Sequence, residues 1–201
     1  MIANNFMSSK HHVIIVPGLG NNIAALMWST KGWSRDRFIP HIFDARWKTE
    51  EPGLQPKLDR AIALVDELTA HGETVSLIGN SAGSSFVLNL FAARKNKIHK
   101  VIINCGRVRA GDWPWHTFAQ ATKDSPSFKE SVLRSEKVIS TLSKADKKKI
   151  LTLRPLFDEV VPPYTVTIPG VTNIVIPSVE HVVSMSLYLT LFRGKIFDFF
   201  H

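Results

Sequence analysis

The chain has 201 residues, of which 44% are hydrophobic, and a formal net charge of +8. This length suits one domain, and a domain of this size buries roughly 70% of the surface that its unfolded chain exposes. The single cysteine, Cys105, excludes an internal disulfide and any multi-cysteine metal site. No stretch approaches about 18 uninterrupted apolar residues, and the N-terminal segment lacks a basic region followed by an apolar run. We therefore expect a single-domain cytoplasmic protein with no signal peptide and no membrane span.

The positive charge is scattered along the chain. Its densest run, residues 144–149, holds four lysines and is broken by Asp146, a pattern typical of a solvated helix face. No zinc-finger, RNP-type or Walker A pattern accompanies this run. The sequence therefore predicts no nucleic-acid partner.

In the first third of the chain, predicted strands alternate with predicted helices. Residues 12–16, HVIIV, form the continuous apolar run expected of a parallel strand that is covered on both faces. A short helix is expected over residues 23–33, followed by a strand over residues 38–44. Pro40 limits that strand to its second half or to a sheet edge, because proline cannot donate to a central ladder. Apolar residues on one helical stripe then predict a helix over residues 54–70.

The most informative stretch is a strand, a glycine-flanked serine and a helix in succession. Residues 74–78, TVSLI, predict a buried strand. The next five residues are GNSAG, which place Ser81 between Gly79 and Gly83 in a G-x-S-x-G motif. From Ser84 onward the pattern predicts an amphipathic helix. A serine in such a strained turn needs glycine-sized neighbours, because strand and helix approach closely there.

The second half of the chain continues the alternation around one longer connection. Strands are predicted at residues 101–104, 150–153 and 173–176, and a closing helix at residues 182–200. Residues 106–148 are polar, contain aromatic residues, and are longer than an ordinary connection. We expect an α/β three-layer sandwich with a mostly parallel sheet of about six strands. Residues 106–148 are a candidate for a small cap-like helical insertion.

The strand, motif and helix together resemble the nucleophile elbow of the α/β-hydrolase superfamily. This resemblance implies a compact α/β-hydrolase fold in which residues 1–201 form one domain without the usual leading hairpin. In that superfamily, backbone N–H groups after the first strand and after the nucleophile hold the oxyanion. The matching donors are Leu19, which follows a Pro-Gly pair, and Ala82. Pro17 stands where the superfamily often has histidine.

The superfamily places its acid and its histidine after the serine in the chain. Asp158 and His181 each follow a predicted strand, in the phrases FDEVVPP and PSVEHVV. A serine hydroxyl needs a base to take its proton, and a carboxylate must orient that base. The resemblance therefore implies Ser81 as nucleophile, His181 as base and Asp158 as the orienting acid. Asp112, after the preceding strand, is the alternative acid, and Glu180 stands where the superfamily more often has glycine.

Pocket residues are harder to assign from sequence. Trp113, Trp115 and Phe118 are candidates for pocket walls, or for the packing that holds residues 106–148 to the domain. Cys105 is more typical of a small buried hydrophobe than of a pocket residue. We expect a serine hydrolase that cleaves a small-molecule ester or thioester through an acyl-enzyme on Ser81, without a metal or organic cofactor. A non-catalytic binding protein, a peptidase or a lyase on the same fold are the alternatives.

Overall fold

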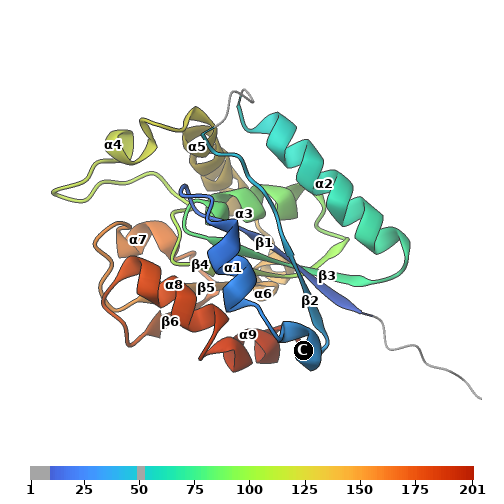
Figure 1. Cartoon of the computed structure of the whole chain (residues 1–201). Helices are drawn as coiled ribbons and strands as arrows, with labels where there is room; N and C mark the ends of the chain where they lie inside the picture. Colours follow the sequence, from blue (N-terminus) through green and yellow to red (C-terminus); the bar gives the residue numbers. More distant parts are fainter. Residues whose placement is uncertain (1–9, 49–52) are drawn as a thin grey trace, which may run out of the picture.

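The computed structural model describes residues 10–48 and 53–201, and its centre is one sheet of six parallel strands. The strand order is β2-β1-β3-β4-β5-β6, and every neighbouring pair is parallel. The strands are β1 (His11–Val16), β2 (Phe38–Ile42), β3 (Thr74–Asn80), β4 (Ile98–Asn104), β5 (Ile150–Pro155) and β6 (Thr172–Ile176). The predicted α/β architecture is confirmed (Figure 1).

Helices cover both faces of the sheet, which makes three layers (Figure 1). One layer contains α2 (Gln55–Ala70), α3 (Gly83–Ala93) and α5 (Pro126–Ser140). The other contains α1 (Ile23–Ser29), the 3₁₀ helix η1 (Trp33–Asp36), α8 (His181–Leu189) and α9 (Arg193–Phe200). The short helices α4 (Phe118–Thr122), α6 (Lys144–Lys148) and α7 (Pro163–Val166) lie in connections between strands.

Strand β1 shows why the sequence has continuous apolar runs. Val13 and Ile15 belong to the core on the α8 and α9 side, whereas Ile14 and Val16 belong to the core on the α2 and α3 side. Successive side chains of a strand point to opposite faces, so a strand covered on both faces needs apolar residues at every position. In the described residues, no helix is both long and apolar enough to cross a membrane.

The helical part of residues 106–148 is largely a layer of the sandwich. Helix α5 packs along α3, where Ser85 Oγ lies 2.8 Å from Ser131 Oγ and Asn89 Nδ2 donates to Ser131 O at 2.9 Å. Phe128 and Val132 of α5 are buried in the core beneath it. Only α4 and the loop before it therefore stay candidates for a cap.

Two predicted helices are interrupted in the structure. The helix expected over 23–33 ends at Ser29, with Thr30 as its C-cap, and Gly32 takes a left-handed conformation with φ +94° before η1 begins at Trp33. The single closing helix expected over 182–200 is also wrong: α8 ends at Leu189 and α9 begins at Arg193. A continuous helix would give the carbonyl of Leu189 to a backbone N–H four residues later, whereas here it accepts from Trp33 Nε1 at 3.1 Å.

Candidate active site

Ser81 follows β3 at the edge where the strands end, in a backbone conformation that few residues adopt. Its φ is +50°, and its N–H donates to the carbonyl of Asn104 at 3.0 Å. The two flanking glycines are required by packing. A Cβ on Gly79 would lie 2.4 Å from the carbonyl oxygen of Gly83, and one on Gly83 would lie 2.2 Å from that of Val16. The G-x-S-x-G motif therefore follows from how closely strand and helix approach.

Ser81, His181 and Asp158 form a hydrogen-bonded series. The Oγ of Ser81 lies 3.0 Å from Nε2 of His181, and Nδ1 of the same ring lies 2.8 Å from Oδ2 of Asp158. Both His181 and Asp158 are buried. The second carboxylate oxygen, Oδ1, accepts the N–H groups of Val160 and Val161 at 2.9 and 2.8 Å. The carboxylate is thus fixed by its own loop while it holds the imidazole.

Two glutamates position the backbone of His181. Glu180 has an extended backbone with φ −145°, and its carboxylate caps α8 by accepting from the N–H of Val183. This position therefore does not need glycine. The carboxylate of Glu159 accepts the N–H of His181 at 3.2 Å. Sequence analysis missed Glu159, whose only signal was its place beside Asp158.

Asp112 has a different partner from Asp158. Its Oδ1 accepts from the N–H of Phe118 at 2.5 Å, at the start of α4, and its backbone carbonyl accepts from Tyr164 Oη at 2.8 Å. Both contacts hold the loop before α4 in place. The carboxylate that contacts His181 is therefore that of Asp158, and the side chain of Asp112 contacts Phe118 instead.

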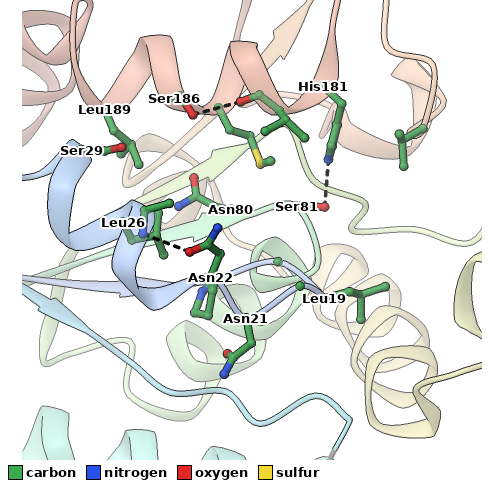
Figure 2. Close-up of a pocket in the computed structure, with 17 residues that line it drawn as sticks. Leu19, Asn21, Asn22, Leu26, Ser29, Asn80, Ser81, His181, Ser186 and Leu189 are labelled. Carbon is green, nitrogen blue, oxygen red and sulfur yellow. Dashed lines mark hydrogen bonds between the residues drawn. The ribbon is translucent and has the colours of Figure 1, made fainter.

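Two cavities meet at Ser81. The larger has a volume of about 390 Å³ and lies between α1 and α8, with Ser81 and His181 at one end and Ser29 and Leu189 at the other (Figure 2). This volume lies within the usual range for ligand sites, roughly 300–1,000 Å³. Apolar side chains dominate its lining: Leu19, Ala25, Leu26, Val160, Val182, Met185 and Leu189. Sequence analysis missed this pocket because its two walls are far apart in the chain.

Asn80 is a second buried polar side chain, besides His181, that lines the larger cavity beside the serine. Asn80 is 3% exposed, and its Oδ1 accepts from Asn104 Nδ2 at 2.6 Å. The Nδ2 of Asn80 has no hydrogen-bond partner in residues 10–48 and 53–201. Asn80 therefore offers this cavity a hydrogen-bond donor.

The smaller cavity has a volume of about 100 Å³ and different chemistry. Leu19, Ser81 and Val160 line both cavities, so the serine lies where the two meet. Arg107 and His116 bring polar groups to the smaller one. The remaining lining residues are Ala82, Ala121, Phe128 and Val161.

The expected oxyanion donors, Leu19 and Ala82, both lie against the serine. The loop of Leu19 packs tightly there, since a Cβ on Gly18 would lie 3.0 Å from Ser81 Cβ. Within the described part of the chain, the backbone N–H groups of Leu19 and Ala82 donate to no protein acceptor. Both groups therefore remain available to a ligand.

The prediction that Trp113, Trp115 and Phe118 form pocket walls is corrected. None of the three lines either cavity at Ser81. The two tryptophan rings stack on each other at 4.8 Å, and Trp115 Nε1 donates to the carbonyl of Glu159 at 3.3 Å. Phe118 packs against the core beside Arg107. These aromatic residues hold their loop to the domain, which was the alternative interpretation.

Cys105 is a fully buried member of the core on the α8 and α9 side. Burial raises the pKa of its thiol well above the ordinary value, so the group stays neutral at physiological pH. In the two described ranges, no three side chains of His, Cys, Asp or Glu lie close enough together to hold a metal ion.

Comparison with known proteins identifies the fold. No family model and no curated protein matches the sequence. An esterase from Thermogutta terrifontis superposes with a TM-score of 0.68 at 15% identity, covering 96% of this chain and 92% of that one. A monoacylglycerol lipase from Paleococcus ferrophilus gives 0.67 at 15% identity over 94% and 93%. A peroxisomal α/β-hydrolase from Saccharomyces cerevisiae gives 0.67 at 12% identity over 95% and 78%. The chain thus has the α/β-hydrolase fold.

Proposed function

We propose that the protein is a serine hydrolase that cleaves a carboxylic ester or thioester through an acyl-enzyme on Ser81. The observation that carries this proposal is the hydrogen-bonded series from Ser81 through His181 to Asp158, with distances of 3.0 and 2.8 Å. In this mechanism His181 Nε2 takes the hydroxyl proton as Ser81 Oγ attacks the carbonyl carbon. Asp158 keeps the proton of the imidazole on Nδ1, so that Nε2 is free to accept.

The tetrahedral intermediate needs donors for its negative oxygen. We assign this role to the N–H groups of Leu19 and Ala82, which lie beside Ser81 and have no protein acceptor among the described residues. Collapse of the intermediate breaks the bond to the alcohol or thiol, which leaves with the proton from His181. Water then attacks the acyl-enzyme by the same steps, which releases the acid and restores Ser81.

The larger cavity supports a substrate with an apolar half. Its volume of about 390 Å³ and its apolar lining suit an alkyl or acyl chain beside the scissile bond. The similar solved structures include an esterase and a monoacylglycerol lipase. A small-molecule ester in the cytoplasm, where the free thiol of Cys105 would stay reduced, is the substrate class we propose.

Labelling with a fluorophosphonate probe tests the proposal. Wild-type protein is expected to react and to hydrolyse p-nitrophenyl esters in a panel of increasing chain length. Ser81→Ala is expected to lose both properties while its circular dichroism stays unchanged. Ser84→Ala is the matched control, because Ser84 Oγ is buried and donates to the carbonyl of Gly79 at 2.7 Å. Folded wild-type protein that neither reacts nor hydrolyses any ester would indicate a binding protein instead.

A further inference from the structure

Arg107 is a buried cation beside the proposed nucleophile. It follows β4, is 2% exposed, and lines the smaller cavity together with Ser81. Its Nη1 donates to the carbonyl of Gly111, whereas its Nη2 has no hydrogen-bond partner in the described residues. Across those residues no carboxylate forms an ion pair with it. The Nη2 group of this guanidinium therefore has no protein partner among the described residues.

An unpaired buried cation is costly for a fold to retain. Buried charges in proteins are normally paired, because removal of an ion from water costs on the order of several kcal/mol. The ring of Phe118 lies 5.6 Å from Arg107 Cζ and attracts the charge, but an aromatic ring does not neutralise a cation as a carboxylate does. Burial lowers the pKa of Arg107, yet an arginine side chain stays protonated at neutral pH. The smaller cavity thus carries a positive charge.

The two cavities offer different chemistry to the two halves of a substrate. The larger holds about 390 Å³, and most of its lining away from Ser81, His181 and Asn80 is apolar. The smaller holds about 100 Å³, which suits a group of a few non-hydrogen atoms, and Arg107 supplies its charge. A planar carboxylate matches the fork of a guanidinium and forms strong charge-assisted hydrogen bonds with it.

We propose that the smaller cavity is a carboxylate subsite, with Arg107 as its specificity-determining residue. The substrate is then an ester or thioester that carries a carboxylate a few atoms from the scissile carbonyl and an apolar chain on the other side. This inference rests on the proposed function, since Ser81 fixes where the carbonyl lies between the cavities. The net charge of +8 raises the encounter rate with such an anion.

Two matched pairs of esters test the subsite and show which half of the substrate carries the carboxylate. Monohexyl succinate is compared with hexyl methyl succinate for the acyl half, and O-octanoylglycolate with its methyl ester for the alcohol half. Turnover is followed by pH-stat titration. Wild-type protein is expected to prefer the charged member of one pair by roughly 10- to 100-fold in kcat/KM, as charge-assisted hydrogen bonds commonly provide.

Variants at Arg107 separate recognition from structural support. Arg107→Met is expected to abolish the preference for the charged ester, mainly through an increase in KM for that ester. Arg107→Lys keeps the positive charge but loses the planar pair of donors that a guanidinium offers, so it should keep part of the preference for the charged ester. Arg109→Met is the matched control: Arg109 Nη2 donates to the carbonyls of Tyr164 and Thr167, and its side chain lines neither cavity.

Binding measurements decide the question independently of turnover. Calorimetric titration of the two charged esters into folded Ser81→Ala and Ser81→Ala/Arg107→Met protein should show at least tenfold weaker binding of one of them to the double variant. Equal binding, or equal kcat/KM for the charged and neutral members of both pairs, overturns the subsite. If the uncharged esters are still hydrolysed and Ser81 still reacts with fluorophosphonate, the proposed hydrolase function stands without it. Absence of labelling and of all turnover would contradict the hydrolase function itself.

Discussion

Ser81 shows how a single backbone conformation places a side chain for chemistry. A left-handed conformation costs a non-glycine residue roughly 1–2 kcal/mol, so the surroundings must hold it. Here Asn104 O accepts the N–H of Ser81, and Ser84 N donates to its carbonyl. The side chain of Ser81 therefore lies beyond the carboxyl end of β3, where its Oγ is 3.0 Å from Nε2 of His181.

Exchange of Asp158 and of Asp112 for asparagine distinguishes the two candidate acids. Asp158→Asn should preserve the fold and reduce the chemical step by up to about 10⁴-fold, because an amide cannot hold His181 in the required tautomer. Asp112→Asn should change ester hydrolysis little, since its side chain accepts from the N–H of Phe118 and, among residues 10–48 and 53–201, has no contact with His181. Rates of p-nitrophenyl ester hydrolysis measure both effects. The reverse order of the two rates would move the acid to the earlier loop.

The three residues of the proposed triad could be predicted because their positions follow strand ends. Ser81, Asp158 and His181 each come within a few residues of the end of a strand, and parallel strands bring their carboxyl ends to one edge of the sheet. Arg107 and Glu159 could not be found this way. Their relevance depends on which cavity or N–H group they face, and only tertiary packing decides that.

At the scale of helices and strands, close backbone contact explains the glycines better than flexibility does. Gly79 and Gly83 have ordinary φ values, yet any Cβ there would overlap backbone atoms of α3 or β1. A backbone carbonyl cannot move aside as the end of a side chain can. The approach of α3 to β1 and β3 therefore depends on hydrogen atoms at these two positions.

Two glycine-to-alanine variants test this point. Gly83→Ala should lower the free energy of unfolding by about 3 kcal/mol or more, or prevent folding, because overpacking against backbone cannot relax. Gly194→Ala should raise it by roughly 0.4–1 kcal/mol, since Gly194 is helical and exposed and its Cβ would meet no atom within 4 Å. Urea denaturation measures both. Similar effects of the two changes would argue against the close contact.

The interrupted helices show where element prediction from sequence ends. Residues 182–200 have enough apolar residues for one long helix, and their single glycine, Gly194, lies beyond the break, within α9. The break coincides with a contact between residues that are more than a hundred positions apart: Trp33 Nε1 donates a hydrogen bond to the carbonyl of Leu189. Buried strands such as β1 could be predicted, because consecutive apolar residues indicate a strand that is covered on both faces. No local pattern in the sequence indicates the contact between Trp33 and Leu189.

At the scale of the whole molecule, the two ends of the sheet differ. The carboxyl ends of the strands hold Ser81 and its partners, while the amino ends hold a group of histidines. His11 donates to or accepts from Ser76 Oγ at 2.8 Å, and its ring lies 5.6 Å from that of His99. Burial, followed by the nearby charges of His99, His201 and His12, lowers the pKa of His11 to about 4.

Stability should therefore fall on acidification. Unfolded His11 takes up a proton near pH 6.5, whereas folded His11 does so only near pH 4. Above pH 6.5 the His11 ring is neutral in both the folded and the unfolded state, so it does not change the free energy of unfolding. As the pH falls from 6.5 toward 4, the unfolded state binds the proton more tightly, and the free energy of unfolding decreases. Urea midpoints between pH 7 and pH 4.5 should decline less steeply for His11→Gln than for wild type. His71→Gln, at an exposed position, is the control and should decline as wild type does.

The larger cavity is walled by α1 near the beginning of the chain and α8 near its end, and Trp33 links the two regions through Leu189. Contacts between distant parts of a chain form slowly, because a long loop must close first. Strands β1, β3 and β4 are complete by Asn104, but His181 and the α8 wall come later in synthesis. A growing chain on the ribosome would thus acquire part of its hydrophobic core well before the proposed triad and its pocket could form.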